Sequence, residues 1–128
     1  MKQTFRGSCH CGKVRFTAGI DLDAGARRCS CAACVKTRAW SVIVEPQDFR
    51  LLGGEQHLCD HTAGSATLRH LFCDHCGVRP FGRGRLEAVD GEVVAVNLAC
   101  LDEVDPALLA AAWARIAKRP LAGALRYG

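Results

Sequence analysis

The chain has 128 residues, of which 49% are hydrophobic and 6% aromatic, and its formal net charge is +4. No low-complexity linker divides the chain, so we expect one domain over residues 1–128. Nowhere do 18 apolar residues run together, and no apolar leader follows the first methionine, so we expect neither a membrane-spanning helix nor a secretory signal. The expected compartment is the cytoplasm, where thiols stay reduced.

The first half of the chain has the patterns of short strands. Residues 13–17 alternate, with Val14 and Phe16 on one face. Residues 40–45 are largely β-branched and apolar, and the proline that follows ends the run. Residues 49–52 form another short run, which two glycines close. These patterns favour a β-rich domain.

The second half adds two strands and a helix. Residues 66–72 and 92–98 have strand patterns. A helix is predicted over 106–118, because Asp105 can cap it and Pro106 suits its first turn. We interpret its apolar stripe as core packing: Leu108, Leu109, Ala112, Trp113 and Ile116. The predicted fold class is mainly β, with short antiparallel strands and one C-terminal helix.

Seven of the nine cysteines lie in three closely spaced groups, which are Cys9 with Cys11, Cys29 with Cys31 and Cys34, and Cys73 with Cys76. Cys59 and Cys100 stand alone. In a reducing compartment such clusters indicate metal binding rather than disulfides. We therefore predict two zinc ions for each chain.

The two cysteine pairs are expected to share one zinc ion. Two cysteines on a tight turn can direct both sulfurs at one centre, and a glycine after the second, Gly12 or Gly77, lets the backbone bend back. Each pair needs two further ligands, so the simplest completion joins the pairs. We predict a closed structural zinc site of Cys9, Cys11, Cys73 and Cys76.

The triple group, Cys29, Cys31 and Cys34, is expected to hold the second zinc ion. Three ligands leave one tetrahedral position free, as catalytic zinc sites do. Cys59, Cys100 or a histidine could instead supply a fourth ligand and make this site structural too. We predict that the position is open.

The charge argues against a nucleic-acid partner. Seven thiolates and two zinc ions would together lower the formal charge of +4 to +1, which is weak attraction for phosphates. Arginines cluster at Arg79, Arg83 and Arg85, and we interpret them as a solvated basic loop.

Together the cysteine groups and their neighbours resemble the glutathione-dependent formaldehyde-activating enzyme (GFA) family, which includes centromere-protein-V-like proteins. The matching stretches are Ser-Cys-His-Cys-Gly-Lys-Val-Arg-Phe at 8–16, Cys-Ser-Cys-Ala-Ala-Cys at 29–34, Phe-Cys-Asp-His-Cys-Gly-Val-Arg-Pro-Phe at 72–81 and Val-Asn-Leu-Ala-Cys-Leu-Asp at 96–102. The ordered set of three groups is specific, whereas any one of them alone is not.

The resemblance implies a β-tent fold, a structural zinc on the two pairs and a catalytic-type zinc on the triple group. It implies carbon–sulfur lyase activity that joins or separates a thiol and an aldehyde, with glutathione and formaldehyde as the founding substrates. The chain departs from the family pattern at 106–128, where a helix and tail replace an extended aromatic segment.

The ligand set supports thiol chemistry independently of the family. Three thiolates on one Zn²⁺ leave a net charge of −1, and such an electron-rich zinc is a weak Lewis acid. Well-known zinc hydrolases use neutral histidines instead, sometimes with one carboxylate. An incoming thiol would suit this metal, which holds it as a thiolate. Glutathione carries two carboxylates, and Lys36 and Arg38 follow the triple group as candidate partners.

Two functions are consistent with these patterns. The first is a zinc-dependent enzyme that forms or breaks thiol–aldehyde adducts of the glutathione type. The alternative is a non-catalytic, zinc-stabilised module that binds a thiol metabolite or a protein.

Overall fold

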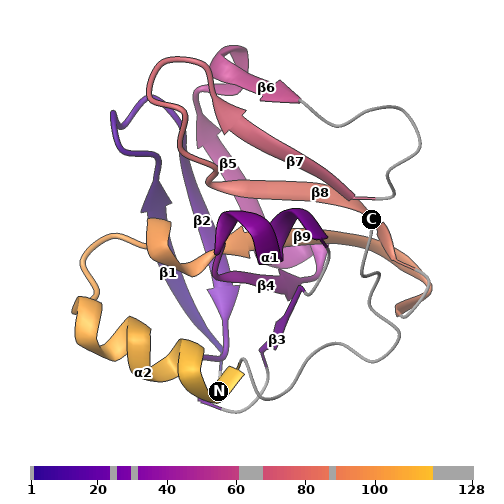
Figure 1. Cartoon of the computed structure of the whole chain (residues 1–128), viewed down its shortest axis with the longest axis vertical. Helices are drawn as coiled ribbons and strands as arrows, with labels where there is room; N and C mark the ends of the chain where they lie inside the picture. Colours follow the sequence, from indigo (N-terminus) through magenta and orange to yellow (C-terminus); the bar gives the residue numbers. More distant parts are fainter. Residues whose placement is uncertain (1, 24–25, 30–31, 61–67, 87–88, 117–128) are drawn as a thin grey trace.

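The computed structural model describes residues 2–23, 26–29, 32–60, 68–86 and 89–116 and consists of two antiparallel sheets (Figure 1). The smaller sheet has the order β1-β2-β5 and comprises β1 (Gln3–Ser8), β2 (Arg15–Ile20) and β5 (Phe49–Gly53). The larger has the order β3-β4-β9-β8-β7-β6 and comprises β3 (Arg27–Arg28), β4 (Ser41–Val44), β6 (Leu58–Asp60), β7 (Leu68–Cys73), β8 (Phe81–Leu86) and β9 (Gly91–Asn97). The mainly β prediction is confirmed.

Helices occupy the connections between the strands. The α-helices are α1 (Ala32–Thr37) and α2 (Pro106–Ile116). Single 3₁₀ turns are η1 (Pro46–Asp48), η2 (Glu55–His57) and η4 (Leu98–Cys100). In Figure 1, α1 lies in front of β4 and β9, whereas α2 lies near the lower end of β1. Among the described residues, no helix combines the length and apolar composition needed to cross a membrane.

Strand β9 separates two groups of buried side chains. It pairs with β4 on one side and β8 on the other, and its residues Val93 to Val96 are all buried. Because side chains of a strand alternate between faces, Val94 and Val96 join the main core, whereas Val93 and Ala95 pack with Cys29 and Cys34. The segment that carries the triple cysteine group therefore rests on the face of β9 turned away from the main core.

Aromatic rings join the two sheets in the main core. Phe16 of β2 stacks on Phe49 of β5 with ring centroids 5.4 Å apart. Phe81 of β8 lies 4.5 Å from the Phe49 ring and 6.2 Å from the Phe16 ring, centroid to centroid. Gly7 leaves room for this cluster, because a Cβ there would lie 2.1 Å from Phe16 Cζ. The smaller sheet is thereby fixed against the larger one.

Helix α2 begins as predicted. The Asp105 carboxylate accepts a hydrogen bond of 2.8 Å from the backbone N–H of Ala107, which is a typical N-cap. Leu109, Ala112 and Ile116 are buried against the main core. Leu108 is 63% exposed, so its assignment to the core stripe was wrong. Of the predicted range, residues 117 and 118 lie outside the described residues.

Other predictions need correction at their edges. The strand predicted over 13–17 begins at Arg15 and continues to Ile20. Two of the three clustered arginines, Arg83 and Arg85, lie in strand β8 rather than in a loop. Arg83 lies in β8 and its guanidinium stacks over the rings of Phe49 and Phe81, at 5.5 and 5.4 Å from their centroids. Such cation–π contacts hold this arginine on the sheet surface.

Candidate metal centre and binding cavities

Two tight turns from distant parts of the chain present the cysteine pairs. In the first, the backbone N–H of Gly12 donates to the Cys9 carbonyl (3.1 Å), and in the second the N–H of Gly77 donates to the Cys73 carbonyl (2.8 Å). Gly12 and Gly77 have φ values of 81° and 79°, the left-handed conformation that glycine adopts without strain. Strands β1 and β7 lead into the two turns, so the sheets position both pairs.

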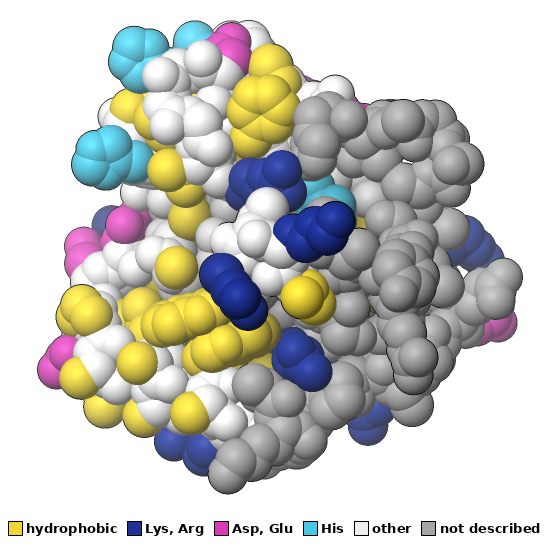
Figure 2. Space-filling model, viewed as in Figure 1, with side chains coloured by type: hydrophobic (Ala, Val, Ile, Leu, Met, Phe, Trp, Pro, Cys, Tyr) yellow, Lys and Arg dark blue, Asp and Glu magenta, His cyan; other side chains and the backbone are white. Residues whose placement is uncertain are grey.

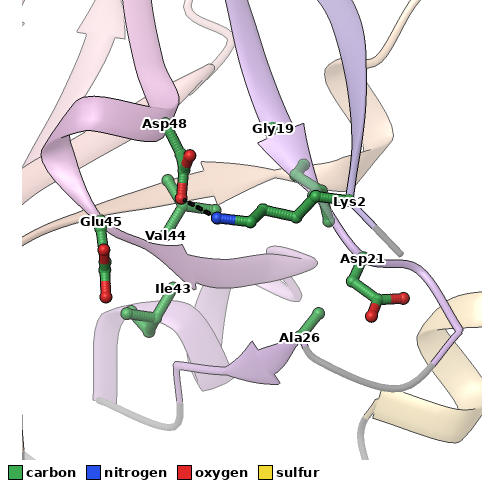
Figure 3. Close-up of a pocket in the computed structure, with 9 residues that line it drawn as sticks. Lys2, Gly19, Asp21, Ala26, Ile43, Val44, Glu45 and Asp48 are labelled. Atoms are coloured by element: carbon green, nitrogen blue, oxygen red, sulfur yellow. Dashed lines mark hydrogen bonds and ion pairs between the residues drawn. The ribbon is translucent and has the colours of Figure 1, made fainter.

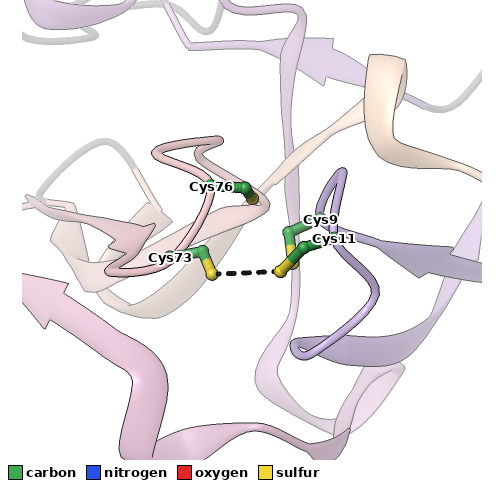
Figure 4. Close-up of side chains that lie close together, drawn as sticks. All are labelled: Cys9, Cys11, Cys73 and Cys76. Atoms are coloured by element: carbon green, nitrogen blue, oxygen red, sulfur yellow. Dashed lines mark hydrogen bonds between the residues drawn. The ribbon is translucent and has the colours of Figure 1, made fainter.

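The four sulfurs converge on one point (Figure 4). The Sγ atoms of Cys9, Cys11, Cys73 and Cys76 all lie within 4.8 Å of one another. The Sγ atoms of Cys9 and Cys11 are 3.6 Å apart, and those of Cys11 and Cys73 are 3.7 Å apart. Disulfide sulfurs would be about 2.05 Å apart, whereas sulfurs at about 2.3 Å around a tetrahedral zinc ion would be separated by about 3.8 Å. This cluster therefore fits a metal ion.

Backbone donors support thiolates in the cluster. The backbone N–H of Val14 donates to Cys9 Sγ, and that of His75 donates to Cys73 Sγ, each over 3.4 Å. Burial opposes ionisation, but hydrogen bonds from the backbone N–H groups of Cys11 and Val78 and from neighbouring thiols lower the pKa of Cys76 to about 6. Donors already directed at sulfur suit a site that must release its protons to bind a cation.

Cys11 is affected in the opposite direction. The backbone at Lys13 lowers its pKa, but burial and the thiols of Cys9, Cys73 and Cys76 outweigh that effect and raise the pKa of Cys11 to about 12. Crowded thiols cannot all ionise in the absence of a positive charge. The cluster therefore needs a cation to hold four thiolates together.

The second cysteine group surrounds α1. Cys29 follows β3, and its backbone N–H donates to the Ser41 carbonyl over 2.9 Å. Cys34 lies in α1, and its carbonyl accepts from the N–H of Ala39 over 3.1 Å. Both side chains are buried. Cys31 lies outside the described residues, so the triple group stays a prediction.

The two isolated cysteines lie elsewhere in the described structure. Cys59 belongs to β6, opposite Phe72 of β7. Cys100 Sγ lies 3.8 Å from the Arg79 carbonyl oxygen, and burial raises the pKa of its thiol to about 12. Among the described residues, neither joins Cys29 and Cys34 in a cluster of three possible ligands.

Two adjoining cavities lie beside α1. The cysteine cavity, of about 180 Å³, is lined by Arg28, Cys29, Cys34, Val35, Arg38, Ala39, Trp40 and Trp113. The arginine cavity, of about 360 Å³, is lined by Thr37, Arg38, Ala39, Trp40, Gly77, Arg79, Asn97 and Ala99. Three residues, Arg38, Ala39 and Trp40, line both, so the cavities adjoin.

Positive charge surrounds these cavities. Lys and Arg side chains gather over α1 and the strands behind it, next to a hydrophobic patch (Figure 2). Arg38 lines both cavities. The side-chain amide of Asn97 donates a hydrogen bond of 3.0 Å to the backbone carbonyl of Arg79. Lys36 is exposed on α1 and is not among the residues that line either cavity. Anionic groups would therefore meet Arg38 and Arg79 here.

A further cavity, shown in Figure 3, has no cysteine in its lining. It has a volume of about 340 Å³ and is lined mainly by the end of β2, by β4 and by η1. Lys2 Nζ lies 2.9 Å from Asp48 Oδ2 at its edge, and hydrogen bonding and attraction from Asp48 raise the pKa of this lysine. No cysteine lines it, so we do not assign the thiol chemistry to it.

Comparison with known proteins agrees with this geometry. The family model described as glutathione-dependent formaldehyde-activating enzyme matches residues 4–115. The chain belongs to the GFA family. It also resembles the crystal structure of a Rhodobacter sphaeroides protein, with 31% sequence identity and a TM-score of 0.64, over 80% of this chain and 92% of that one. The GFA resemblance noted in the sequence is confirmed.

Sequence reasoning missed several residues of the cavities. Arg28 lies just before Cys29 but in a stretch without a predicted element. Trp40 carried only a strand pattern, and Trp113 was interpreted as core packing, although it also lines the cysteine cavity. Arg28, which directly precedes Cys29, was a usable signal for a cationic side chain beside the second cysteine group.

Proposed function

We propose that this protein joins a thiol to the carbonyl carbon of an aldehyde, or reverses that reaction, in the cysteine and arginine cavities. The observation that carries the proposal is that two buried cysteines and Arg38 line the cysteine cavity, while Arg38 and Arg79 line the arginine cavity next to it. A thiol that bears carboxylates, such as glutathione, would place its sulfur in the first and a carboxylate in the second. Membership of the GFA family supports this substrate class.

The three cysteine groups would provide the ligands for two metal ions. The four-sulfur cluster would hold a structural zinc ion, and Cys29, Cys31 and Cys34 would hold a second. When bound, that second ion would keep an incoming thiol in its thiolate form near neutral pH. Cys29 and Cys34 fit this role because they are buried and line one cavity.

The chain's own residues would orient the reactants. Arg38 and Arg79 can bind a carboxylate through charge-assisted hydrogen bonds. Arg28 Nε is buried and has no hydrogen-bond partner among the described residues, and buried donors usually have one. Arg28 lines the cysteine cavity, so its guanidinium would donate to the carbonyl oxygen as negative charge develops there.

The reaction needs no redox partner. The sulfur donates an electron pair to the carbonyl carbon, a carbon–sulfur bond forms and the π bond of the carbonyl breaks onto oxygen. The proton that leaves the thiol ends on that oxygen and gives a hydroxyl group. The reverse reaction returns the proton to sulfur and releases the aldehyde, which is lyase chemistry.

The test is the rate at which zinc-loaded protein equilibrates glutathione with ¹³C-formaldehyde, measured by NMR exchange spectroscopy. We expect exchange well above the rate without protein. Cys34→Ser should abolish the increase while the fold, monitored by circular dichroism, persists. Exchange that the wild-type protein fails to accelerate with formaldehyde and with benzaldehyde alike would refute the enzyme and leave the non-catalytic binding module.

Two arginine variants and one lysine control test the placement of the substrate. Arg38→Ala and Arg79→Ala should each weaken the binding of glutathione at least about tenfold, because a charged hydrogen bond contributes about 1.5–3 kcal/mol. Neither substitution should weaken the binding of 2-mercaptoethanol, which has no carboxylate. Lys36→Ala is the matched control and should leave both thiols unchanged, contrary to the prediction from sequence alone. A loss confined to Lys36→Ala would refute this placement.

A further inference from the structure

The two tryptophans of the chain meet at the cysteine cavity. Trp40 directly precedes β4, and Trp113 lies on α2, 73 positions further along the chain. Their rings are stacked, with centroids 6.1 Å apart and planes inclined by 14°. Both residues line the cavity that Cys29 and Cys34 also line. An aromatic wall therefore stands beside the sulfurs of the second cysteine group.

Both tryptophans lie on segments that are anchored to the core. The Trp40 carbonyl accepts a hydrogen bond of 2.8 Å from the backbone N–H of Leu98, which ties it to the end of β9. Leu109, Ala112 and Ile116 anchor α2 in the main core. Trp113 packs against that core but is only partly buried, unlike its three neighbours. Part of the aromatic surface therefore stays available to a ligand.

The space next to the sulfurs is larger and more apolar than formaldehyde requires. Besides the two arginines and two cysteines, the lining is Val35, Ala39, Trp40 and Trp113. A water molecule takes about 30 Å³ in the liquid, so the cavity of about 180 Å³ has room for several heavy atoms. Formaldehyde has one carbon and one oxygen and would leave most of this wall without contact.

We propose that Trp40 and Trp113 select an aldehyde whose carbonyl carbon bears an apolar group, aromatic or branched aliphatic, over formaldehyde. This inference rests on the proposed function and specifies its substrate class. In the adduct, the thiol carboxylate meets Arg38 and Arg79, and the apolar group lies against the two rings. Trp113 is thereby a specificity residue that the C-terminal helix contributes.

Binding of product analogues tests whether Trp40 and Trp113 prefer an apolar group, without requiring turnover. S-benzylglutathione and S-methylglutathione stand for the adducts of benzaldehyde and formaldehyde without the hydroxyl group. Isothermal titration calorimetry should show that the benzyl compound binds at least about tenfold more tightly, since even one methylene in an apolar pocket discriminates by roughly 10- to 200-fold. Both tryptophans of the chain lie at this cavity, so intrinsic fluorescence should report the same binding.

Substitution of the wall should remove the preference. Trp113→Ala should bring the benzyl-to-methyl ratio to within about twofold of unity, and Trp113→Leu, which keeps an apolar contact for folding, should reduce it at least about threefold. Leu108→Ala changes an exposed position on the same helix and is the matched control. A ratio unchanged in both Trp113 variants would overturn the inference.

The reaction itself separates the two proposals. The wild-type protein should react glutathione with benzaldehyde at a higher kcat/KM than with formaldehyde, and Trp113→Leu should reverse that order. Equal or better use of formaldehyde by the wild type would overturn the inference and leave the proposed function intact. Reaction with neither aldehyde would overturn the proposed function, even if the benzyl compound still binds preferentially.

Discussion

Removal of one sulfur from the four-cysteine cluster should cost the protein much of its stability. Cys73 is completely buried, and its Sγ lies 3.7 Å from that of Cys11, 62 positions earlier in the chain. A metal at this cluster closes that loop in the folded state and links the two sheets. Cys73→Ser should break this link while leaving the volume of the side chain almost unchanged.

The size of the effect follows from the affinity of the folded protein for the metal. An ion that binds the folded state alone adds its binding free energy to folding, which is about 4 kcal/mol at a free zinc concentration 1,000 times the Kd. That is a large part of the roughly 5–15 kcal/mol by which a domain is stable. For a chain of this size the loss corresponds to a fall in Tm of roughly 12–20 °C.

The assay is thermal and urea unfolding of zinc-loaded protein, followed by circular dichroism. Cys59→Ser is the matched control, because Cys59 lies in β6 outside the cluster and should cost less than about 1 kcal/mol. Chelation of zinc from the wild type should bring its Tm close to that of Cys73→Ser. Equal losses of stability in Cys73→Ser and Cys59→Ser, with no effect of the chelator on the Tm of the wild type, would refute the metal cross-link.

Three further predictions concern parts of the structure outside the four-cysteine cluster and the proposed second metal site. Gly7→Ala should lower the free energy of unfolding by about 1–3 kcal/mol, because its Cβ would lie 2.1 Å from Phe16 Cζ; Gly19→Ala, which meets nothing closer than 3.5 Å, is the control in urea titrations. Asp105→Ala should cost about 1 kcal/mol by removing the N-cap of α2, and Asp105→Ser should recover most of it in the same titrations. Cys100 should resist iodoacetamide at pH 8 in the folded protein, because burial raises the pKa of its thiol to about 12 and only the thiolate reacts. Unfolding returns that pKa to about 8.5, so mass spectrometry should find Cys100 labelled after denaturation; rapid labelling of the folded protein would contradict the assignment.

Parts of this fold follow from local chemistry. The cysteine turns could be predicted because each ends in a glycine, Gly12 or Gly77, that the turn requires in a left-handed conformation. Helix α2 could be predicted because Asp105 and Pro106 mark its start. Strand β9 has a β-branched apolar run that few other elements would accommodate.

Other parts depend on neighbours far away in sequence. Strand β8 contains two glycines and two arginines, and pairing with β7 and β9, rather than propensity, makes it a strand. The stacking of Trp40 and Trp113 joins two segments that no local pattern connects. Arg38 could be named as a candidate because it follows the triple cysteine group, but its backbone conformation, φ 57°, is one that non-glycine residues rarely adopt and was not predicted.

The distance in sequence between the two cysteine turns also sets an order of events on the ribosome. Cys9 and Cys11 leave the ribosome 62 or more residues before Cys73 and Cys76, which at about 5–20 residues per second is a delay of roughly 3–12 seconds. Strands β1, β2 and β5 all precede Cys73, so the smaller sheet can pair during that interval. The nascent chain meanwhile displays half of a metal site, two thiols without their partners, to the metals and oxidants of the cell. A metal at the four-cysteine cluster would therefore bind late in synthesis, after all three strands of the smaller sheet have been made.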